Sequence, residues 1–78
     1  DLLFHAQEWQ FCIQDIKLML NRLGLAFIGF EGIEEAKQKY AQMFPEDHKL
    51  NNLDNWSAFE EKYPDTFKSM YFIIAQRR

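Results

Sequence analysis

The sequence predicts an α+β fold, in which about three helices pack on an antiparallel pair of strands. Two uncharged apolar runs, near residues 24–30 and 70–76, have the length and composition of strands. The segments before and between them carry apolar residues at the three- and four-residue spacing of amphipathic helices. The chain has 78 residues, which suits one hydrophobic core, so we expect residues 1–78 to form a single unit.

The first helix is predicted to end at Gly24. The chain before this residue contains neither glycine nor proline. Apolar residues recur there on one helical face, at Ile13, Ile16, Leu20 and Leu23. A glycine in the left-handed conformation commonly closes a helix, which is why we place the boundary here.

Two starting points are open for this helix. Apolar residues continue at heptad-like spacing back to Leu2, and one long helix over residues 2–23 would satisfy that spacing. Leu3, Phe4 and Phe11 fall off this stripe, however, which favours a break near Phe11.

Two further helices are predicted between the strands. The first ends before Pro45, because proline disfavours helical geometry in the residue that precedes it. Its apolar face is formed by Ile33, Ala36, Tyr40, Met43 and Phe44. The second begins at Asn51 or Asp54, either of which can cap it, and ends at Pro64. Its apolar face is formed by Leu53, Trp56, Phe59 or Glu60, and Tyr63.

Both strands are expected to be buried and to lie side by side. The first is an uncharged run bracketed by Gly24 and Gly32. The second, Met70–Ala75, is apolar at consecutive positions, which is typical of a strand covered on both faces.

Composition argues against several classes of function. The nine Lys and Arg residues are scattered among twelve Asp and Glu, with a net charge of −3, so we expect no nucleic-acid partner. No apolar run approaches the ~18–20 residues that cross a bilayer, so we expect no membrane partner. The single cysteine cannot form an internal disulfide, which fits a reducing compartment and predicts a cytoplasmic location.

The residues themselves indicate no catalytic, cofactor-binding or metal site. If residues 1–16 were helical, one face would carry His5, Glu8, Cys12 and Asp15. Four side chains spaced along the axis of one straight helix cannot surround a zinc ion, so we predict no metal. The neighbours of Cys12 are apolar, and we therefore expect a buried, inert thiol.

Other polar and aromatic groups are expected to be structural. The acid pairs Glu34–Glu35 and Glu60–Glu61 are predicted to be solvated charges on helix faces. The glycines do not form a phosphate-binding fingerprint, because Gly24 precedes a strand that the fingerprint would have to follow. Four aromatic residues are expected in the core rather than on a base-stacking surface: Trp9, Phe11, Trp56 and Phe67.

Several short motifs, taken in order, resemble one known family. They are Asp1-Leu2-Leu3-Phe4-His5, Gln7-Glu8, Phe11, Gly24-Leu25-Ala26-Phe27-Ile28-Gly29-Phe30-Glu31, Asp54-x-Trp56-x-x-Phe59-Glu60 and Pro64-Asp65-Thr66-Phe67-x-x-Met70-Tyr71. Their order and spacing cover nearly the whole chain. They are similar to the C-terminal end of bacterial class I S-adenosylmethionine-dependent methyltransferases, of the type often joined to tetratricopeptide repeats. One departure is that Cys12 and Gln14 stand where this type tends to have Thr and Pro.

The resemblance implies a place for each strand in a seven-stranded sheet. Leu25–Phe30 would be the sixth strand, and Met70–Ala75 would be the antiparallel seventh strand, which lies between the fifth and the sixth. The stretch His5–Phe11 would follow the fifth strand and border the substrate cleft. The cofactor loop of such enzymes lies in their N-terminal part, so S-adenosylmethionine is expected to bind the parent enzyme and not this segment.

The resemblance therefore implies a C-terminal, substrate-side segment of a methyltransferase that is not active alone. Its partner would be the remainder of its own parent chain. The residues implied for the substrate pocket are His5, Glu8, Trp9 and Tyr71. The alternative is a small non-catalytic α+β interaction or dimerisation domain, whose partner would be either the rest of its own chain or a second copy in a homo-oligomer.

Overall fold

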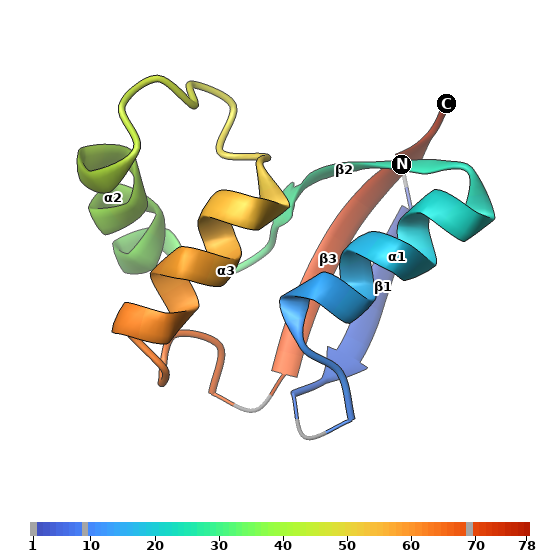
Figure 1. The fold of residues 1–78 in the computed structure, drawn as a ribbon, viewed down its shortest axis with the longest axis horizontal. Helices are drawn as coiled ribbons and strands as arrows, with labels where there is room; N and C mark the ends of the chain where they lie inside the picture. The colour runs from blue at the N-terminus through green and yellow to red at the C-terminus, as the bar shows by residue number, and fades with distance from the viewer. Residues whose placement is uncertain (1, 9, 69) are drawn as a thin grey trace.

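The computed structural model describes residues 2–8, 10–68 and 70–78, and within these ranges it has three helices and three strands (Figure 1). In chain order these are β1 (Leu2–Gln7), α1 (Ile13–Leu23), β2 (Leu25–Phe30), α2 (Glu34–Met43), α3 (Leu53–Lys62) and β3 (Met70–Arg77). The predicted α+β fold is confirmed.

The three strands form one antiparallel sheet in the order β1-β3-β2. The predicted pairing of the two apolar runs is confirmed, because β2 pairs with β3 starting from Leu25 opposite Arg77. This pairing has one register shift, between Phe27 and Gly29, which is typical of a β-bulge. Although β3 comes last in the chain, it is the central strand.

One long helix over residues 2–23 does not form. The first residues instead make β1, which pairs with β3 from Leu2 opposite Ala75 to Gln7 opposite Met70. The chain then turns, and α1 begins only at Ile13, so the predicted break in this stretch is confirmed. Pairing with β3 decides the outcome, because a distant strand supplies hydrogen bonds that no local spacing reveals.

The core lies on one face of the sheet, called here the inner face. On β3, this inner face carries Tyr71, Ile73 and Ala75, which are all buried. The helices α1 and α3 lie side by side in front of the sheet in Figure 1 and cover this face. Their buried residues are Ile13, Ile16, Leu20, Leu53, Trp56 and Phe59.

Aromatic rings fill much of this core. The Phe30 ring centroid lies 4.6 Å from that of Phe67 and 5.2 Å from that of Trp56. The predicted burial of Trp56 and Phe67 is therefore confirmed. The same prediction is wrong for Phe11, which is exposed because it lies in the turn between β1 and α1. Trp9 lies outside the described residues.

The opposite face of the sheet, called here the outer face, is more open. It carries Leu3, His5, Met70, Phe72 and Ile74. Leu3 is 56% exposed and Phe72 is 39% exposed. The prediction that the last strand is covered on both faces is thus wrong for this chain, because α1 and α3 cover only the inner face.

The helix ends are fixed by side chains and by one glycine. Asn52, which lies between the two predicted caps, is the residue that caps α3: its side-chain oxygen accepts the N–H groups of Asp54 and Asn55. A cap must directly precede the first helical residue to reach these groups, which excludes Asn51 and Asp54. Gly24 closes α1 in the left-handed conformation, with φ 69°, as predicted.

Gly24→Ala should lower the free energy of unfolding by about 1 kcal/mol, because an L side chain disfavours the left-handed conformation. Gly29→Ala is the matched control. Neither glycine has an atom near its missing Cβ, and only Gly24 has a positive φ. Urea unfolding of both variants measures the difference. Equal effects at the two positions would contradict the assignment of Gly24 as a conformational helix stop.

Candidate functional site

Three polar side chains from separate parts of the chain meet at one end of the sheet. The Tyr71 hydroxyl donates a hydrogen bond of 2.6 Å to Oε2 of Glu60. The Glu8 carboxyl is also a hydrogen-bond partner of Glu60. These residues form the acid–tyrosine cluster: Glu8 follows β1, Glu60 lies near the end of α3, and Tyr71 lies near the start of β3.

The fold explains why these three residues converge. Tyr71 stands opposite Ala6 and points to the inner face, because side chains alternate along a strand. Glu8 comes two residues after Ala6, so it leaves β1 beside the start of β3. Glu60 lies four residues after Trp56, one helical turn further along the buried face of α3.

The environment of Glu60 favours its protonated form. Burial raises the pKa of Glu60 to about 7, and the Glu8 carboxyl, through a hydrogen bond and its like charge, also raises this pKa. The hydrogen bond from Tyr71 acts in the opposite direction. Burial and the contact with Glu60 in turn raise the pKa of Tyr71. Near neutral pH, Glu60 can therefore take up or release a proton while Tyr71 stays a donor.

Two of the four residues implied by the resemblance belong to this cluster, Glu8 and Tyr71. His5 does not: it stands opposite Phe72 on the outer face, and its ring meets the Phe72 ring edge-on with centroids 4.7 Å apart. Because neighbouring residues of a strand point to opposite faces, His5 and Tyr71 lie on opposite sides of the sheet. Trp9 again lies outside the described residues.

Glu60 is the member of the cluster that sequence reasoning missed. Its predicted place among solvated charges is wrong, since it is half-buried, whereas Glu61, Glu34 and Glu35 are exposed as predicted. The helical spacing could have indicated this burial, because position 60 fits the apolar face of the third helix as an alternative to Phe59. An acid on an apolar helical face is a candidate for an altered pKa.

The predicted burial of Cys12 is wrong as well. Cys12 is exposed at the start of α1, where its backbone N–H donates a hydrogen bond of 2.9 Å to Asp15. In the described residues, no group of three or more His, Cys, Asp or Glu side chains could hold a metal ion. None of the helices described there has the length and apolarity that a bilayer crossing requires.

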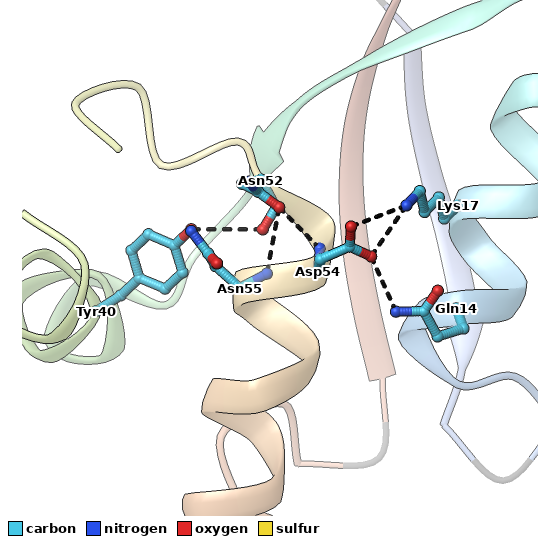
Figure 2. Close-up of polar contacts among 6 residues, drawn as sticks. All are labelled: Gln14, Lys17, Tyr40, Asn52, Asp54 and Asn55. Atoms are coloured by element: carbon cyan, nitrogen blue, oxygen red, sulfur yellow. Dashed lines mark hydrogen bonds and ion pairs between the residues drawn. The ribbon is translucent and has the colours of Figure 1, made fainter. Parts of the chain in front are cut away.

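A second polar cluster joins α1, α2 and α3, and Figure 2 shows it. Lys17 of α1 reaches both carboxylate oxygens of Asp54 at 2.9 Å, and Gln14 donates to one of them at 3.2 Å. These hydrogen bonds hold the pKa of the Asp54 carboxyl below its usual value. The Tyr40 hydroxyl lies 3.4 Å from the backbone oxygen of Asn52, at the cap of α3. Both oxygens of Asp54 are engaged within the fold, so we interpret this cluster as a structural link.

A groove of about 1170 Å³ opens where β2 ends and β3 begins. It is lined by the residues after β2, the first turns of α2, the end of α3 and the loop before β3. Tyr63 lies in it with the ammonium groups of Lys39 and Lys62 at 5.1 and 5.8 Å from its ring centroid. Its lining mixes acids and lysines, so its charge favours no single class of ligand.

Glu60→Gln should remove a pH dependence of stability. A folded pKa of about 7, against 4.5 when unfolded, contributes stability that is complete below about pH 4.5 and is lost as the pH rises through 7. We expect the free energy of unfolding to fall by about 1–2 kcal/mol over this range, less than the full shift implies because the carboxyl is partly hydrated. Glu61→Gln should retain the loss. Urea unfolding from pH 4.5 to 8 tests this, and identical profiles for the two variants would contradict it.

Tyr71→Phe should raise the pKa of Glu60 above its wild-type value, because it removes a hydrogen bond that stabilises the ionised carboxylate. NMR titration of the Glu60 side-chain carboxyl carbon measures the shift directly. Tyr63→Phe is the control, since Tyr63 lies outside the acid–tyrosine cluster. A fall or no change in the pKa of Glu60 in the Tyr71 variant would contradict the hydrogen-bond assignment.

Comparison of the chain with protein-family models, curated proteins and solved structures finds no match. The resemblance to class I methyltransferases therefore stays a prediction, and its consequences for function enter as a proposal.

Proposed function

We propose that this chain is the C-terminal, substrate-side segment of an S-adenosylmethionine-dependent methyltransferase and is not active alone. The observation that carries the proposal is the strand order β1-β3-β2, with β3 antiparallel to both neighbours. The resemblance implies this arrangement for the fifth, seventh and sixth strands. The resemblance places the fifth strand before His5, whereas β1 extends from Leu2 to Gln7, so the pairing of β1 with β3 supports the proposal with the end of this strand a few residues later than expected.

In this assignment β1 takes the place of the fifth strand, which changes one expectation. His5 lies within β1 and not after it, so the stretch that follows the strand begins at Glu8. In open α/β sheets, ligands bind beyond the carboxyl ends of the parallel strands. Glu8 lies at that end of β1, and Tyr71 lies at the same end because β3 runs in the opposite direction. This supports Glu8 and Tyr71, more than His5, as residues on the substrate side.

The acid–tyrosine cluster suits the positioning of a methyl acceptor. Methyl transfer depends mainly on alignment of the acceptor with the methyl group. Carboxyl oxygens of Glu8 and Glu60 can accept hydrogen bonds from an acceptor N–H or O–H group. We assign these residues a positioning role. The cofactor would be held by the N-terminal part of the parent enzyme.

An alternative function, an interaction or dimerisation domain, is supported by a different observation. The outer face exposes large apolar side chains, among them Leu3 and Phe72, and Ile28 at the bulge of β2 is also exposed. Exposed apolar side chains gathered on one sheet face are typical of a surface that a partner covers. This alternative requires no cofactor.

The test compares the 78-residue chain with the full-length protein that carries it. The full-length protein should bind S-adenosylmethionine in calorimetry, and the isolated chain should not. In the full-length protein, Glu8→Gln and Tyr71→Phe should raise KM for the acceptor several-fold and leave the Kd for S-adenosylmethionine unchanged. Glu61→Gln is the matched control. A full-length sequence without a glycine-rich turn after a strand and an acidic residue about 20 positions later would contradict the proposal.

A further inference from the structure

We draw no further inference here: the strongest candidate, the apolar outer face of the sheet where Leu3 and Phe72 are exposed, carries none because nothing in the structure shows what covers it.

Discussion

The burial of one face of β3 is the constraint on which the rest of the structure depends. Tyr71, Ile73 and Ala75 alternate along this strand and form the floor of the core. Both β1 and β2 pair with β3 and with no other described strand, so the sheet joins the two ends of the chain. Leu2 lies opposite Ala75, which means that closure of the core requires a contact between residues far apart in sequence. The helices α1 and α3 then cover the same face.

This arrangement also creates the acid–tyrosine cluster. An inward tyrosine near the end of a strand needs a partner for its hydroxyl, and Glu60 of α3 supplies the acceptor. Partial burial of Glu60 beside a second carboxyl then raises its pKa towards neutrality. A cluster of this kind can serve a binding site, but it can also be a structural contact with a pH-dependent stability. Its place at the carboxyl end of β1 is what favours a substrate-side role.

The outer face and the edge of β1 are the two parts of the sheet that the described helices leave uncovered. Both expose apolar groups that the described chain leaves in contact with water, and both could be covered by additional protein. In the proposed methyltransferase the cover would come from the parent chain. In the alternative function it would come from a partner. The two functions differ in what covers the sheet rather than in the fold of these residues.

The sequence by itself determined the local elements, because their signals are local. Gly24 closes α1 through its own backbone freedom, Pro45 follows the end of α2, and the apolar run Met70–Ala75 forms a strand. Tertiary structure decided what depends on distant partners. The apolar spacing before Phe11 also allows a helix, and pairing with β3 makes Leu2–Gln7 a strand. Glu60 belongs to a pair of acids expected to be solvated, and the fold instead places it half-buried in contact with Tyr71 and Glu8. Hydrogen bonds and burial between remote segments outweigh a local preference of a few tenths of a kcal/mol per residue.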